Sequence, residues 1–227
     1  MRKLVCTALI AVLAVLVLPA PRAHAQPAQA QERKFEYTID TMGAPDLKDW
    51  AETLRPEIDK WYPRIVEYLP SDGYSAPKSF TITFKKVDGV AYTSGTAVVG
   101  AEAWFKAHPD DRGAIIHELV HVVQQYHSRR NPGWLVEGVA DYIRWIKYEP
   151  ANKRPHPNPA RAKYTDSYRT TAAFLEYVAA NYDHEIAVHL NEAMREGRYR
   201  PELWTEYTGK SADDLGAEWL KSLAPKP

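Results

Sequence analysis

Cysteine is nearly absent from this chain of 227 residues, in which Cys6 is the only one. Cys6 lies in an N-terminal segment that starts with Arg2 and Lys3, continues as an apolar run from Leu4 to Leu18 and ends with Ala23-His24-Ala25. A basic start, a short apolar run and an Ala-x-Ala site are typical of a signal peptide, and we expect cleavage near Ala25. The mature chain would then lack disulfides, which leaves an apolar core and any bound metal to stabilise it.

The chain also lacks an apolar run long enough to span a membrane. The apolar run of 15 residues is shorter than the roughly 20 residues needed to cross a bilayer, and no later segment is long or apolar enough to do so. We therefore expect a secreted protein, extracellular or periplasmic, without a membrane span. Residues 1–25 are the expected signal peptide, residues 26–33 an aperiodic, flexible tail, and residues 34–227 a single domain.

Neither sign of charge is in excess. The whole chain has 29 basic and 29 acidic residues, and removal of a leader with three basic residues leaves 26 against 29. Binding to nucleic acids or to anionic membranes calls for Lys and Arg clustered on one face. The composition therefore argues against both kinds of partner.

Hydrophobic periodicity predicts strands first and helices later. Apolar residues alternate over residues 35–39 and 80–84, which indicates two half-buried strands. Between them, residues 47–68 carry a helical apolar stripe that two prolines are expected to kink or divide. Residues 90–105, rich in small and β-branched side chains, are expected to form a strand or hairpin. Because the strands precede most of the helices instead of alternating with them, the order favours an α+β fold.

The remaining elements are predicted to be helices separated by turns and one loop. Asp110 or Asp111 is expected to cap the first of them, and Ser211 the last, with Asp214 three residues further on. A proline-rich loop is expected over residues 149–161. The expected helices cover residues 112–126, 134–147, 168–181, 184–195 and the segment after Ser211.

The sequence His117-Glu118-Leu119-Val120-His121 predicts a metal site. Residues four apart share a helix face, so His117 and His121 can bind one ion with Glu118 beside it. A catalytic zinc site needs a third protein ligand and keeps a position for water. The third ligand must therefore come from elsewhere in the chain.

Two residues compete for that third position. His127 has the spacing of the metzincin motif, but Gln124 stands where that motif has glycine, and a continued helix would carry His127 about 9 Å along the axis. Glu137 follows a turn that lets a second helix fold back on the first, so we favour Glu137. Asp141 lies one turn further on and is expected to accept the other ring N–H of a zinc-bound histidine, with His117 preferred.

These residues resemble a known family. Glu137 and Asp141 are similar to the glutamate and following aspartate of the gluzincins, the group that includes thermolysin, although the gap after the second histidine is shorter. The chain is also similar to the plant-type basic secretory protein family, which occurs in bacteria too. The similar stretches cover nearly all of the mature chain and include residues 89–95, 117–125, 132–144, 167–177, 190–197 and 208–210.

The resemblance implies a zincin-like α+β domain with a small mixed sheet, an active-site helix and a helical C-terminal half. It implies a secreted, zinc-dependent metallopeptidase that hydrolyses peptide bonds through a zinc-bound water activated by Glu118. Family members are often linked to defence. This chain is not basic, so a role that depends on positive charge is not expected of it.

A hydrogen-bond donor is also needed for the oxyanion that forms during peptide hydrolysis. By similarity of spacing with the catalytic tyrosine of aminopeptidase-like gluzincins, Tyr168 is the candidate. Tyr142 and Tyr126 are rivals, and the plain alternative is that Tyr168 only packs. The segment from Gly95 to Trp104 is expected to be an edge strand that pairs with substrate, with an interior strand as the alternative.

The expected partner is a peptide or protein substrate, and we expect the chain to be a monomer. Two imidazoles and a carboxylate suit zinc, although other divalent ions accept the same ligands. Two other functions stay open. One is a secreted zinc-binding protein of the same fold without turnover, and the other is a zinc hydrolase of non-peptide amides or esters.

Overall fold

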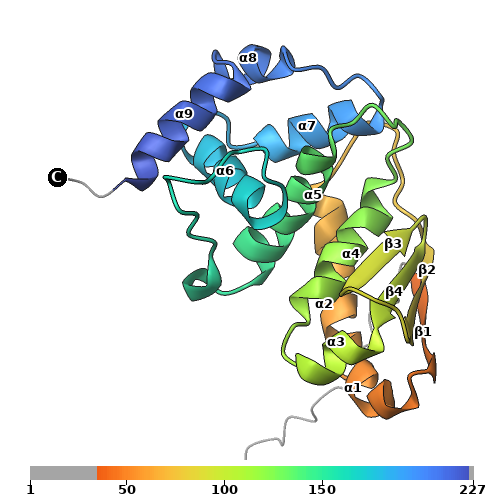
Figure 1. Cartoon of the computed structure of the whole chain (residues 1–227). Coiled ribbons are helices and arrows are strands. Elements are labelled where there is room, and N and C mark those ends of the chain that lie inside the picture. The colour runs from red at the N-terminus through yellow and green to blue at the C-terminus, as the bar shows by residue number, and fades with distance from the viewer. Residues whose placement is uncertain (1–34, 225–227) are drawn as a thin grey trace, which may run out of the picture. The chain divides into compact units, whose positions relative to one another are not determined.

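The computed structural model describes residues 35–224 (Figure 1). The expected signal peptide over residues 1–25 and the tail over residues 26–33 lie outside the described residues, so both stay predictions. Among the described residues, the structure contains no helix with the length and apolar character that crossing a membrane requires.

Four strands form one mixed sheet in the order β1-β2-β4-β3. The pairs β1–β2 and β2–β4 are parallel, whereas β3 and β4 form an antiparallel hairpin. The hairpin turns at Gly95, whose positive φ of 59° suits a two-residue loop. The strands run over β1 (Glu36–Gly43), β2 (Ser79–Lys85), β3 (Ala91–Ser94) and β4 (Ala97–Ala101).

The buried face of β2 follows from its alternating sequence. Phe80, Ile82 and Phe84 are buried, whereas the residues between them are more exposed. The Phe80 ring lies 4.6 Å from the ring of Tyr62 on α2, measured between centroids. A methyl group on Gly100 would come within 2.5 Å of Phe84, so glycine in β4 leaves room for that ring. The sheet therefore packs one face against the helices.

Nine α-helices complete the described residues, together with two short 3-10 helices and a π-helix. Pro56 lies in the first turn of α2 and separates it from α1, as expected, whereas Pro63 lies inside α2, which continues past it. The α-helices are α1 (Lys48–Glu52), α2 (Arg55–Tyr68), α3 (Glu102–Ala107), α4 (Gly113–Gln124), α5 (Gly133–Asp141), α6 (Tyr168–Asn181), α7 (Ile186–Arg195), α8 (Leu203–Thr208) and α9 (Ala212–Leu223).

Most of the helix predictions are confirmed. The helix predicted over residues 134–147 is α5 followed directly by the π-helix η2 (Tyr142–Tyr148). The loop predicted over residues 149–161 is present and contains one 3-10 turn, η3 (Ala151–Lys153). The other 3-10 helix is η1 (Pro45–Leu47). Ser211 accepts a hydrogen bond from the Asp214 backbone and caps α9 as expected. The short helix α8 was not predicted, and residues 102–107 form α3 instead of extending the hairpin. The α+β fold class is confirmed.

Helix α4 lies between the sheet and the C-terminal helices, in contact with β3, β4, α2 and α5 (Figure 1). The expected aspartate cap at its start is wrong, because the Asp111 carboxylate accepts hydrogen bonds from Arg144 and from Trp104 instead. At its end, Arg195 of α7 donates to the carbonyls of Val123 and Gln124 at 3.2 and 3.3 Å. A cation at the carbonyls of the last helical turn stabilises the helix end.

Candidate metal centre

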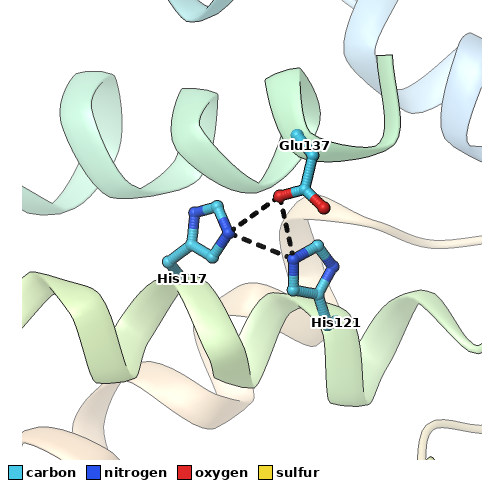
Figure 2. Close-up of side chains that lie close together, drawn as sticks. All are labelled: His117, His121 and Glu137. Carbon is cyan, nitrogen blue, oxygen red and sulfur yellow. Dashed lines mark hydrogen bonds and ion pairs between the residues drawn. The ribbon is translucent and has the colours of Figure 1, made fainter. Parts of the chain in front are cut away.

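Three side chains from α4 and α5 converge on one point (Figure 2). His117 and His121 lie one turn apart on α4, and their Nε2 atoms are 3.1 Å apart. Glu137 reaches them from α5, with its Oε2 3.2 Å from His117 Nε2 and 3.4 Å from His121 Nε2. The turn between the two helices therefore brings the residues together as the sequence predicts, and the group is able to hold a metal ion.

The outer nitrogen of each imidazole has its own hydrogen-bond acceptor. His117 Nδ1 lies 2.7 Å from Asp141 Oδ1, and both side chains are buried. His121 Nδ1 lies 2.7 Å from the side-chain oxygen of Gln124, whose amide nitrogen donates to the Val136 carbonyl at 3.0 Å. Each Nδ1 thus carries a proton when the ring is neutral. Both Nε2 atoms then present lone pairs to the shared point.

This geometry fits a tetrahedral metal ion. Ligand atoms at about 2.0–2.1 Å from zinc in a tetrahedron lie about 3.3 Å from one another. The three separations of 3.1, 3.2 and 3.4 Å are close to that value. Two imidazole lone pairs and a carboxylate at such distances repel one another unless a cation or a proton lies between them.

The pKa values of two of these residues reflect the same demand for positive charge. Burial lowers the pKa of His117, but hydrogen bonds to Asp141 and Glu137 raise it, with a net result of about 9. Burial raises the pKa of Glu137, but hydrogen bonds from His117 and His121 bring it down to about 2. In the metal-free protein a proton on His117 therefore supplies the positive charge that a metal ion would supply.

His127 does not join this group, but the reason differs from the expected one. The sequence predicts a helix that continues to residue 126 and carries His127 away along its axis. Instead α4 ends at Gln124, and Gln125 adopts a left-handed conformation with φ of 42°. The chain turns there, so His127 lines the same cavity without approaching the three ligand atoms.

Glu118 lies beside the metal group and is buried. Its Oε2 accepts a hydrogen bond of 2.7 Å from the hydroxyl of Thr93 on β3. Neither the contact of Thr93 with Glu118 nor that of Gln124 with His121 is expected from the sequence. Thr93 and Gln124 both lie in stretches that resemble the family, and this resemblance is the only feature of the sequence that points to them. Their contacts depend on how β3 and α5 pack around α4.

The metal group opens into a cavity of about 1050 Å³. Helix α4, strand β3 and the segment before α6 all contribute to its wall. The expectation that Gly95–Trp104 forms the edge strand is wrong, because β4 pairs with β2 on one side and β3 on the other. Strand β3 lies at this edge of the sheet and β1 at the other, and three residues of β3, Ala91, Tyr92 and Thr93, line the cavity.

Tyr168 stands at the rim of this cavity, with 54% of its surface exposed and its ring centroid 6.1 Å from that of His117. The negative charge of Glu137 raises the pKa of its phenol. Ser167 and Tyr168 both have positive φ, 67° and 48°, which is costly for residues other than glycine. A strained conformation that places a tyrosine at the cavity suggests a functional role.

The rival tyrosines are placed differently. The Tyr126 hydroxyl donates to Asn191 at 3.0 Å, and burial raises its pKa. Tyr142 is buried and does not line the cavity. Among the three candidates, Tyr168 is therefore the one with an exposed ring beside the metal group.

A family model described as a peptidase of plants and bacteria matches residues 64–219, which include all the residues of the metal group. No curated protein and no solved structure matches the chain.

Proposed function

The chain belongs to this family of plant and bacterial peptidases, the basic secretory protein family, and we propose that it is a secreted, zinc-dependent metallopeptidase. One observation carries the proposal. His117, His121 and Glu137 direct three ligand atoms at one point, and Glu118 lies beside them in an open cavity. A structural zinc site is closed by four protein ligands, whereas a catalytic site keeps a position open.

The site residues have separate roles in this proposal. His117, His121 and Glu137 hold the ion, and Asp141 and Gln124 orient the two imidazoles through their Nδ1 atoms. Zinc bound there would polarise a water and lower its pKa toward neutrality. Glu118 takes the proton of the attacking water as general base and passes it to the leaving amine.

The cavity wall supports a peptide substrate. Edge strand β3 pairs with β4 on one side, and no strand within residues 35–224 pairs with its other side, where an extended peptide would pair through main-chain hydrogen bonds. Tyr168, at the rim, is proposed to donate its hydroxyl to the oxyanion of the transition state. The N-terminal segment ending near Ala25 supports secretion, and we propose that residues 34–227 act as a monomeric domain.

Peptide-library cleavage tests this proposal, with Glu118→Gln as the diagnostic variant. The wild-type protein is expected to cleave peptides, and the variant to bind zinc equally well but lose at least 100-fold in turnover, since it has no general base. Glu67→Gln, at an exposed glutamate of α2, is the matched control and should cleave normally. Full activity of Glu118→Gln would contradict the mechanism.

The same experiment separates the two alternatives. Zinc binding without cleavage of any peptide would favour a binding protein. The buried Glu118 beside the metal group argues against that alternative. Cleavage of amides or esters but of no peptide would favour a non-peptide hydrolase.

A further inference from the structure

The hydroxyl of Thr93 makes the closest polar contact to the carboxylate of Glu118. Its Oγ1 lies 2.7 Å from Glu118 Oε2 and 3.1 Å from the Glu118 backbone oxygen. One hydroxyl has one proton, and the shorter distance assigns it to the carboxylate. Within residues 35–224, the other carboxylate oxygen, Oε1, makes no hydrogen bond, so it is free to face the reacting water.

The contact joins two elements that are distant in sequence. Thr93 lies on the edge strand β3, while Glu118 lies on α4, which packs against that strand. Along β3 the exposed side chains of Tyr92 and Ser94 alternate with the half-buried side chain of Thr93, which therefore faces the helix. Threonine is also stiff at χ1, so its hydroxyl is held in place by the strand.

We propose that Thr93 is a positioning residue, which fixes the carboxylate of the general base and couples it to the strand that receives the substrate. The proposal rests on the proposed function of Glu118. A glutamate side chain has three rotatable bonds, and a base displaced by about 1 Å loses much of its efficiency. The hydrogen bond to Oε2 holds one orientation and leaves Oε1 for proton transfer.

This role predicts a specific kinetic signature. The main chain of β3, which would pair with substrate, is unchanged when the Thr93 side chain changes, so KM should stay constant. The metal ligands make no hydrogen bond to Thr93, so zinc binding should stay constant as well. Only turnover should fall, by roughly 10- to 100-fold, the effect of losing one hydrogen bond to a charged group.

Four variants of the full chain test the proposal: Thr93→Val, Thr93→Ala, Thr93→Ser and Thr38→Val. The first two lack the hydroxyl, and Thr93→Ser keeps it. Thr38→Val removes the hydroxyl of an exposed threonine on β1, away from the cavity, and is the control. We would measure kcat and KM on one peptide, zinc content and Tm for each.

The expected result is a 10- to 100-fold lower kcat for the valine and alanine variants, with KM and zinc content unchanged. Thr93→Ser should stay within about threefold of wild type, and Thr38→Val should equal it. If Thr93→Val does not fold, the proposal is tested by comparing Thr93→Ala with Thr93→Ser, because their side chains differ by one oxygen atom.

Two results would overturn the role of Thr93. One is an unchanged kcat in Thr93→Ala, and the other is an equal loss in the alanine and serine variants accompanied by lower zinc content or Tm. If wild-type protein cleaves no peptide at all, the proposed function itself fails, which is a distinguishable outcome.

Discussion

The buried carboxylate of Asp141 offers a quantitative test of how the metal group is built. Asp141 Oδ1 lies 2.7 Å from His117 Nδ1, and only 4% of its side chain is exposed. Asp141→Asn keeps the shape and an acceptor oxygen but removes the negative charge. The charge-assisted hydrogen bond then becomes a neutral one of about half the strength, and the imidazole becomes a weaker ligand.

The expected loss of zinc affinity is about 10- to 100-fold, or about 1.4–2.7 kcal/mol. The loss should depend on pH, because Asp141 also raises the pKa of His117, which reaches about 9 in the metal-free protein. Below pH 9 a proton competes with zinc for His117 Nε2. The substitution Asp141→Asn lowers the affinity of this nitrogen for the proton as well as for zinc. The two effects offset each other in part at pH 7, so the loss should be larger at pH 9.

Competition with a chromophoric chelator at both pH values measures this loss. Asp183→Asn is the matched control, because Asp183 Oδ2 lies 2.8 Å from His189 Nδ1, in a similar pair with no metal ligand. It should leave zinc affinity unchanged. A folded Asp141→Asn protein that binds zinc as tightly as wild type at pH 9 would refute the reasoning.

Three further predictions concern the same helices. Gln124→Met removes the acceptor of His121 Nδ1 and should weaken zinc binding about 10- to 100-fold, as the same chelator competition would show. Wild-type zinc affinity should rise about tenfold per pH unit from pH 6 to 8 and level off above pH 9, because His117 must lose its proton, and calorimetry in two buffers should detect its release. Gly138→Ala would place a methyl group 2.2 Å from Thr171 Cγ2 and should cost about 1–3 kcal/mol in urea unfolding, whereas Gly133→Ala, with open space around it, should change stability by less than about 0.5 kcal/mol.

Local rules of spacing predicted the metal group. His117 and His121 share a helix face because they are four residues apart, and Glu137 and Asp141 share another for the same reason. Asn131-Pro132-Gly133 ends one helical run shortly before the next, so the two faces meet. Such short-range relations can be read from a sequence without knowledge of the rest of the fold.

Contacts that depend on the order of strands in the sheet could not be predicted from spacing in the sequence. Thr93 reaches Glu118 because β3, and not β4, lies at the sheet edge and packs on α4. One signal was present in the sequence, because residues 97–101 are all small or apolar, as in an interior strand, whereas residues 91–94 include polar side chains. The left-handed turn at Gln125 had no signal, because it occurs at a residue other than glycine.

The central claim is that one metal ion held by His117, His121 and Glu137 is required for peptide hydrolysis. Titration of chelator-stripped protein with zinc, with the cleavage rate followed on one peptide, tests it most directly. The claim predicts no cleavage by stripped protein and a linear recovery that ends at one zinc per chain. Cleavage at an undiminished rate by the fully stripped protein would contradict it.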